Sequence, residues 1–273
     1  MKPSVDVVIP VENNFHALRF CLSSVRRFTP DHVRVFLVLS GCDHHTVTKC
    51  SEWAEKRTNT SIVDLGVRMG IVQAANAGLG MTDASASILL APEICVTKNW
   101  TGKLVHGLEA DPWVGIVAPL SNIAPGARIE LPPGFDYVAV GDFIENMGAP
   151  VFPSLARPGW GCIAISRRCL DSIGPLDPVL AERHDVALDY SLRAGYYGFK
   201  TRMNDDTFVF HPGRVVAGVD ETARKRSRNI VESRWKSIIE GVLAEDGSQG
   251  VVKRINSALG GLCRTGYQRV LWI

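Results

Sequence analysis

Short runs of β-branched and aliphatic residues alternate along the chain with longer segments in which apolar residues recur at helical spacing. Val5–Ile9 and Val33–Leu39 are runs of the first kind, and each is predicted to form a strand. Between them, the apolar residues of segment 15–25 recur every three or four positions, which predicts a helix with one buried face. The chain therefore begins with a strand, a helix and a second strand.

The alternation continues as far as residue 118. Helices are predicted for Thr46–Arg57, for Gly70–Met81 and after Asn99, and strands for Ser61–Leu65, Ser87–Leu90 and Val114–Ala118. Strands separated by helices of about ten or more residues form βαβ units with parallel strands. We therefore expect an α/β fold with a mostly parallel central sheet flanked by helices.

Residues 120–157 interrupt this pattern. Five prolines at positions 125, 132, 133, 150 and 153 are interleaved with glycines, so no long helix or strand is expected. Such a segment is either a linker or a loop that binds substrate, and a compact domain favours the loop. Regular structure resumes with a predicted strand at Trp160–Ser166 and a helix at Asp185–Tyr197, and a basic helical segment follows Thr222.

The composition limits the classes of protein that fit. The 273 residues are 46% hydrophobic, which suits one large domain or a domain with an appendage, and the net charge of +2 does not indicate a nucleic-acid partner. No apolar run approaches the roughly 20 residues that span a bilayer. The start, Met1–Asp6, lacks the pattern of a signal peptide, and the seven cysteines include no C-x-x-C pair. We expect a cytoplasmic protein with reduced thiols.

Six motifs occur in an order that resembles a known family. They are Val7–Asn13 (VVIPVEN), Gly70 with Asn76 and Gly78, Ile88–Trp100 (ILLAPEICVTKNW), Gly161–Arg168 with Ile173–Asp177, Asp189–Arg193 (DYSLR) and Phe208–His211. As an ordered set over residues 4–236, they are similar to the family 2 glycosyltransferases of GT-A fold.

The resemblance implies an enzyme that moves a sugar from a nucleotide-sugar donor to an acceptor hydroxyl, usually with inversion at the anomeric carbon. It implies a Rossmann-like nucleotide-sugar-binding half at residues 1–119, an acceptor-binding and catalytic half at 120–221, and a basic helical C-terminal extension at 222–273. The acceptor would be a glycan, a lipid-linked molecule or a protein.

The resemblance also implies a divalent cation. In the family, aspartates after the fourth strand hold a metal that bridges the two phosphates of the donor; here Ala91-Pro92-Glu93 occupies that place. Mg²⁺ or Mn²⁺ needs only one or two protein carboxylates when phosphates and water complete its shell. We expect Glu93 and His211 as the metal ligands, although a histidine at this place could instead cap a strand end.

The donor-binding residues implied by the family motifs are Pro10, Glu12, Ser40, Arg68, Asn76 and Glu93. Ser40 stands where the family usually has an acid that holds the base or ribose, and a hydroxyl cannot supply that charge. Glu12 could replace the missing acid or be a solvated loop residue. The Arg68 guanidinium could bind phosphate in a bidentate way or face water.

Catalysis by inversion needs a base that deprotonates the acceptor hydroxyl. The family takes it from an acidic cluster at the start of a helix, and its usual position falls here on Ala187. Asp185 and Asp189 share one helix face, so we expect Asp185 as the base and Asp189 as its positioner or substitute; a helix cap and a surface acid are the alternative. Trp160 and Gly161 are expected to contact the acceptor, through stacking and close approach.

The last segment, Val251–Ile273, mixes lysines and arginines with apolar residues. It could lie on an anionic membrane at the inner face, pack on the core, or contact a second subunit as a homo-oligomer. Two other functions are alternatives to sugar transfer. A GT-A-like module that binds nucleotide-sugars without transferring them fits the thinned acidic motifs, whereas a nucleotidyltransferase would need glycines or basic residues that Pro10–Asn14 lacks.

Overall fold

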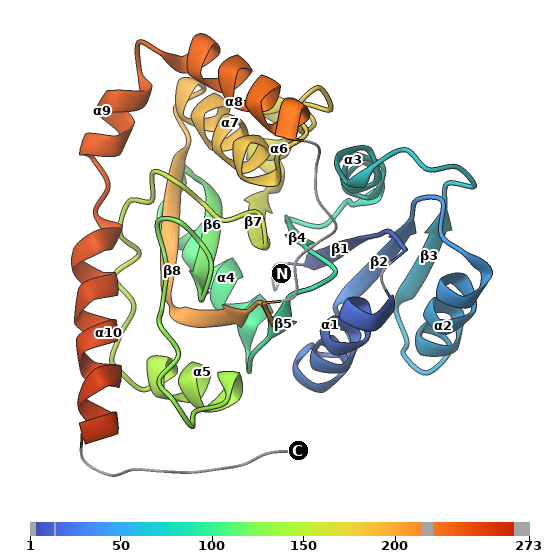
Figure 1. The fold of residues 1–273 in the computed structure, drawn as a ribbon, viewed down its shortest axis with the longest axis horizontal. Helices are drawn as coiled ribbons and strands as arrows, with labels where there is room; N and C mark the ends of the chain where they lie inside the picture. The colour runs from blue at the N-terminus through green and yellow to red at the C-terminus, as the bar shows by residue number, and fades with distance from the viewer. Residues whose placement is uncertain (1–3, 14, 214–220, 265–273) are drawn as a thin grey trace.

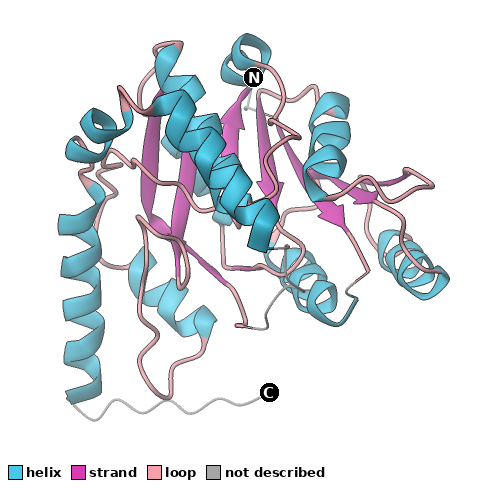
Figure 2. Cartoon of the chain, turned by 45° about the horizontal axis from the view of Figure 1, so that its top comes forward, coloured by secondary structure: helices cyan, strands magenta, loops and turns pink. Residues whose placement is uncertain are grey.

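The computed structural model describes residues 4–13, 15–213 and 221–264. Within this part of the chain, eight strands form one sheet in the order β3-β2-β1-β4-β7-β6-β8-β5, with helices on both faces (Figures 1 and 2). The predicted α/β class, the mostly parallel sheet and the C-terminal helical tail are confirmed.

The N-terminal half follows the predicted alternation. Its elements are β1 (Val5–Val11), α1 (Phe15–Phe28), β2 (Arg34–Leu39), α2 (His44–Ala54), β3 (Thr60–Asp64), α3 (Ile71–Met81) and β4 (Ala86–Leu90). β1 pairs in parallel with both β2 and β4, and β2 pairs in parallel with β3. The carboxyl ends of these strands therefore meet at one edge of the sheet, where open α/β folds bind ligands.

The C-terminal half departs from a simple parallel arrangement. Its elements are β5 (Cys95–Val96), α4 (Trp100–Glu109), β6 (Val114–Ser121), α5 (Tyr137–Glu145), β7 (Cys162–Ser166), α6 (Arg167–Ile173), α7 (Arg183–Tyr196) and β8 (Lys200–Phe210). β7 runs antiparallel between β4 and β6. The expectation of no long element in residues 120–157 was wrong for α5, because the prolines flank this helix and Asp136 caps its start by accepting a hydrogen bond from Ala139 N–H.

β8 begins at Lys200, well before the motif Phe208–His211. β8 pairs in parallel with β6, and the register of this pairing shifts between Pro119 and Leu120. The last residues of β8 also pair with β5, and that pairing is antiparallel. Polar residues inside β8 are not typical of a buried strand, but here Asp205 is buried and has hydrogen-bond partners. Its carboxylate accepts hydrogen bonds from the backbone N–H groups of Val151 and Phe152. The end of β8 therefore lies beside β5, close to the chain segment that follows β4.

Three helices close the described chain: α8 (Glu221–Trp235), α9 (Ile239–Ala244) and α10 (Ser248–Arg264). α9 and α10 run along the outside of β8, while α8 lies next to α7 (Figure 1). Ile255 and Leu259 of α10 are buried in an apolar cluster with Leu120 and Met203. Of the three possibilities for this segment, the structure therefore shows packing on the core as far as residue 261, while the predicted tail from residue 265 lies outside the described residues.

No helix in the described part of the chain is both long and apolar enough to cross a bilayer.

Candidate functional site

Strand register brings together residues that are far apart in the sequence. Glu93 lies in the turn after β4, where Ala91 N–H donates to the carbonyl oxygen of Gly161 at 2.9 Å. β5 starts two residues later, and its Cys95 pairs with Phe210 at the end of β8. Because the pairing is antiparallel, the chain beyond Phe210 places His211 opposite Ile94, next to Glu93.

A cavity of about 150 Å³ opens at this point. It is lined by Glu93, Ile94, Ile123, Trp160, Gly161, Glu182, Arg183, His184, His211 and Arg224. The structure thus gathers the two predicted metal ligands and the two predicted acceptor-binding residues around one space. It adds charged residues from the start of α7 and from α8.

The Glu93 carboxylate is held by an arginine. Glu93 is only 7% exposed, and its Oε1 lies 2.5 Å from Nη1 of Arg183, the first residue of α7. The other terminal nitrogen of Arg183 lies 4.0 Å from Oε2 of Glu12, which follows β1. A guanidinium therefore stands between the acids at the ends of β1 and β4.

The backbone of His211 is fixed by Asn122. The Asn122 amide donates to the His211 carbonyl oxygen and accepts from the His211 N–H, both at 2.8 Å. The ring Nδ1 accepts a hydrogen bond from Gly213 N–H at 3.0 Å, so in the neutral ring the proton is on Nε2. Burial lowers the pKa of His211 below its usual value, which favours this neutral form.

The two predicted acceptor residues differ in their surroundings. Trp160 is buried, and its indole Nε1–H has no hydrogen-bond partner within the described chain. A buried donor without a partner is costly, and a ligand oxygen in the cavity could satisfy it. At Gly161, a Cβ atom would come within 2.9 Å of Ile94 Cδ1, so a larger residue would force the Ile94 side chain, which lines the cavity, to shift.

The acids around α7 are divided between the cavity and the protein interior. Glu182 lines the cavity, and its Oε2 lies 3.1 Å from Nε of Arg224. Asp185 is buried beside Ser227 of α8, away from the cavity-lining set; its Oδ2 has no partner among the described residues, and burial raises the pKa of its carboxyl group.

Asp189 is placed in the interior. Its fully buried carboxylate accepts hydrogen bonds from Arg193 Nε at 3.0 Å, Arg234 Nη1 at 2.6 Å and Trp235 Nε1 at 2.9 Å. Oδ1 accepts from Arg234 and Trp235 and so ties α7 to α8, whereas Oδ2 accepts from Arg193 of the same helix. The geometry does not bring Asp189 to the cavity.

Among the remaining donor-binding residues, two have their polar atoms engaged. The Ser40 hydroxyl accepts from Met69 N–H at 2.9 Å, which holds the loops after β2 and β3 together. The Asn76 amide donates to and accepts from the backbone of Leu176, both at 2.9 Å. Pro10 is buried in β1, while Arg68 is exposed in the loop after β3.

Four residues near the cavity are not among the site residues predicted from the sequence: Arg183, Glu182, Arg224 and Asn122. Arg183 carried a usable signal, because a positive charge in the first turn of a helix is unfavourable with respect to the helix dipole and needs an anionic neighbour. Asn122 carried none, since its role depends on strands β6 and β8 ending side by side.

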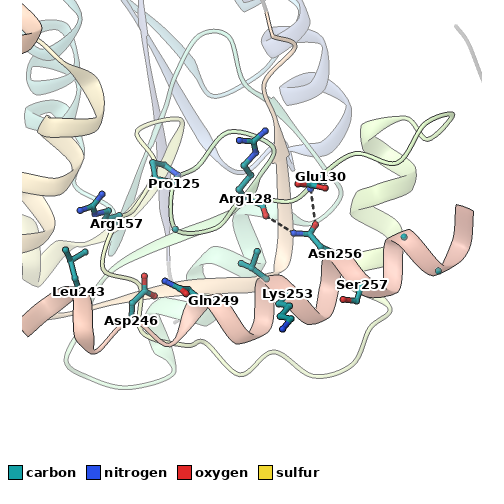
Figure 3. Close-up of a pocket in the computed structure, with 14 residues that line it drawn as sticks. Pro125, Arg128, Glu130, Arg157, Leu243, Asp246, Gln249, Lys253, Asn256 and Ser257 are labelled. Atoms are coloured by element: carbon teal, nitrogen blue, oxygen red, sulfur yellow. Dashed lines mark hydrogen bonds between the residues drawn. The ribbon is translucent and has the colours of Figure 1, made fainter. Parts of the chain in front are cut away.

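A larger cavity of about 1020 Å³ lies between α10 and the loops that contain Arg128 and Arg157 (Figure 3). Asn256 of α10 bridges to these loops, donating to the Arg128 carbonyl oxygen at 3.2 Å and accepting from Glu130 N–H at 2.9 Å. None of the predicted site residues is among those described as lining this cavity.

The comparisons with known proteins identify the fold. Residues 6–131 match the model of the family described as glycosyl transferase family 2. This part of the chain is therefore similar to the family 2 glycosyltransferases, and the solved structures below show that the fold is of the GT-A type. A search of curated proteins finds no match to the sequence.

Solved glycosyltransferases share this GT-A fold at low sequence identity. The mannosyltransferase PcManGT from Pyrobaculum calidifontis, in complex with GDP-Man and Mn²⁺, is 16% identical with a TM-score of 0.64; the match covers 97% of this chain and 76% of that one. GalNAc-T7 with UDP, GalNAc and Mn²⁺ is 20% identical with a TM-score of 0.63, over 87% of this chain and half of that one. S. aureus TarS 1–349 in complex with UDP is 11% identical with a TM-score of 0.60, over 97% and 72%.

Proposed function

We propose that the chain is a glycosyltransferase that moves a sugar from a nucleotide-sugar to an acceptor hydroxyl, with inversion at the anomeric carbon. The observation that carries this proposal is the cavity of Glu93, Arg183, Trp160 and His211 at the carboxyl edge of the GT-A sheet. It combines charged side chains suited to a diphosphate with an indole suited to a sugar.

The donor would lie across the ends of β1, β2 and β4. Glu12 and Ser40 directly follow β1 and β2, and Arg68 is exposed in the loop after β3, so these residues are proposed to face the nucleoside. Of the similar structures, PcManGT is in complex with GDP-Man and TarS 1–349 is in complex with UDP. Both nucleotides remain candidates for this chain.

Transfer with inversion is a displacement at the anomeric carbon. The acceptor oxygen bonds to that carbon while its bond to the phosphate oxygen breaks, the electron pair leaves with the nucleoside diphosphate, and the acceptor proton passes to a base. We propose Glu182 as this base in preference to Asp185, because a base must reach the acceptor and Glu182 is the acid from this cluster that lines the cavity.

The acceptor is proposed to approach through Trp160 and Gly161. The indole Nε1–H is a buried donor without a partner in the described chain, and a hydroxyl of a glycan, a lipid-linked sugar or a protein side chain would satisfy it.

A module that binds nucleotide-sugars without transferring them is the second candidate. It is favoured by Ala187, which stands at the base position implied by the family resemblance and is fully buried. The two functions differ in turnover. The enzyme slowly hydrolyses its donor, or transfers the sugar, even when the acceptor is poor, whereas the module only binds the donor.

A thermal-shift screen of UDP-, GDP- and dTDP-sugars tests the proposal. The true donor should raise the melting temperature in a concentration-dependent way, because it binds the folded state. Release of nucleoside diphosphate from that donor then separates the enzyme from the module. A flat response to every nucleotide-sugar would contradict both candidates.

A further inference from the structure

A guanidinium occupies the position at which the sequence predicts a cation. Arg183 contacts Glu93 at 2.5 Å and lies 4.0 Å from Glu12, and its side chain is largely buried. Its charge is therefore held between the strand ends of β1 and β4. In this fold, that edge is where the sequence analysis expects the donor diphosphate.

The residues present do not fit a divalent metal ion. Glu93, the predicted carboxylate ligand, is neutralised by Arg183. The Nδ1 lone pair of His211 accepts the Gly213 N–H, which leaves the other ring nitrogen protonated in the neutral form. Because no three His, Cys, Asp or Glu side chains of the described chain come together in one group, a metal here would depend on Glu93 and His211 themselves.

Arg183 has the chemistry to bind a diphosphate directly. A guanidinium has five N–H donors in a planar fork, so contact with Glu93 leaves other donors available for phosphate oxygens. Arg183 is also the first residue of the fourteen-residue helix α7, whose N-cap residue Glu182 makes no side-chain capping hydrogen bond. Uncapped backbone N–H groups at a helix start favour an anion at the same place.

We propose that Arg183, positioned by Glu93, binds the donor diphosphate in place of a divalent cation, so that donor binding needs no metal. This inference rests on the proposed function, since it names how that donor is held. Glu93 is then a positioning residue for Arg183 and not a metal ligand. The positive charge of Arg183 would also offset the negative charge that develops on the departing nucleoside diphosphate.

Isothermal titration of the full chain with UDP and with GDP, in EDTA and separately in Mn²⁺ or Mg²⁺, tests the inference. The nucleotide that binds should have nearly the same affinity in all three conditions. Arg183→Ala should weaken it about 10- to 100-fold, which corresponds to the loss of a charge-assisted hydrogen bond worth about 1.5–3 kcal/mol. Arg183→Lys should be intermediate, because it keeps the charge but loses the planar fork.

Removing the arginine should also change the response to metal. In Arg183→Ala the Glu93 carboxylate loses its partner, so Mn²⁺ should recover part of the lost affinity, an effect that a merely structural role would not produce. Arg19→Ala is the matched control, since Arg19 is an exposed arginine on α1, and it should bind nucleotide as wild type does.

The outcomes separate the inference from the proposed function. Wild-type binding that is abolished by EDTA and restored by Mn²⁺ or Mg²⁺ would overturn the inference and leave the glycosyltransferase intact. Undiminished binding by folded Arg183→Ala or Arg183→Lys would overturn it as well. If neither nucleotide binds in any condition, dTDP is titrated in the same way, and failure of all three contradicts the proposed function and the inference with it.

Discussion

Asp189→Asn should lower stability without acting on the chemistry of the site. The fully buried carboxylate accepts three hydrogen bonds, two of them from the guanidinium groups of Arg193 and Arg234. An asparagine keeps one acceptor oxygen, but it removes the negative charge and turns an N–H group toward the donors. Breaking such a buried pair costs about 3–5 kcal/mol.

The lower end of this range is expected here. Arg193 and Arg234 are 21% and 37% exposed, and both keep other acceptors: Arg234 also contacts Asp177 at 2.8 Å, and Arg193 the Pro175 carbonyl oxygen at 2.8 Å. A loss of about 3 kcal/mol corresponds to a fall in melting temperature of about 6–12 °C for a chain of this size.

Differential scanning calorimetry at neutral pH measures this shift. Asp185→Asn is the matched control, because it makes the same change one helical turn earlier at a carboxylate whose Oδ2 has no described partner, and it should leave the melting temperature unchanged or slightly raised. The reasoning is refuted if Asp189→Asn melts within about a degree of wild type, since that difference is far below the fall expected from the lost ion pairs.

Three further predictions concern the site. Glu182→Gln should lower the turnover of the donor by about 10²–10⁴-fold, the usual effect of losing a general base, while nucleotide affinity stays the same; a larger loss in Asp185→Asn would return the base to Asp185. Burial raises the pKa of Asp185, so the folded protein binds that proton more tightly than the unfolded chain. Wild type should therefore gain stability relative to Asp185→Asn as the pH falls from the raised pKa towards the ordinary aspartate range. Melting temperatures of the two proteins that change in parallel with pH would exclude this. Burial also lowers the pKa of His211, so its ring should titrate by NMR below the usual histidine value, and a midpoint above that value would contradict burial as the main influence on the ring.

Most of the fold could be predicted because hydrophobic spacing reports local structure directly. The apolar positions of 15–25 predicted α1, and the run Val33–Leu39 predicted β2 to within one residue. The missed pieces depend on distant partners. β5 has only two residues and exists because β8 pairs with it, and the buried acids inside β8 read as loop until the backbone groups that satisfy them are known.

The site could be predicted in part for the same reason. Motif order was enough to select Glu93, Trp160, Gly161 and His211, which the structure places around one cavity. The partners of these residues could not be predicted. The Arg183 contact to Glu93 spans 90 positions, and neither the length of the connecting chain nor its composition determines where the start of α7 lies.

A crystal structure of the full chain with bound nucleoside diphosphate tests the central claim most directly. The account predicts density for the nucleotide at the carboxyl ends of β1 and β4, with its phosphates beside the Arg183 guanidinium and the sugar side open toward Trp160. Nucleotide bound instead in the cavity between α10 and the loops of Arg128 and Arg157 would contradict it, because the site would then lie apart from Glu93 and His211.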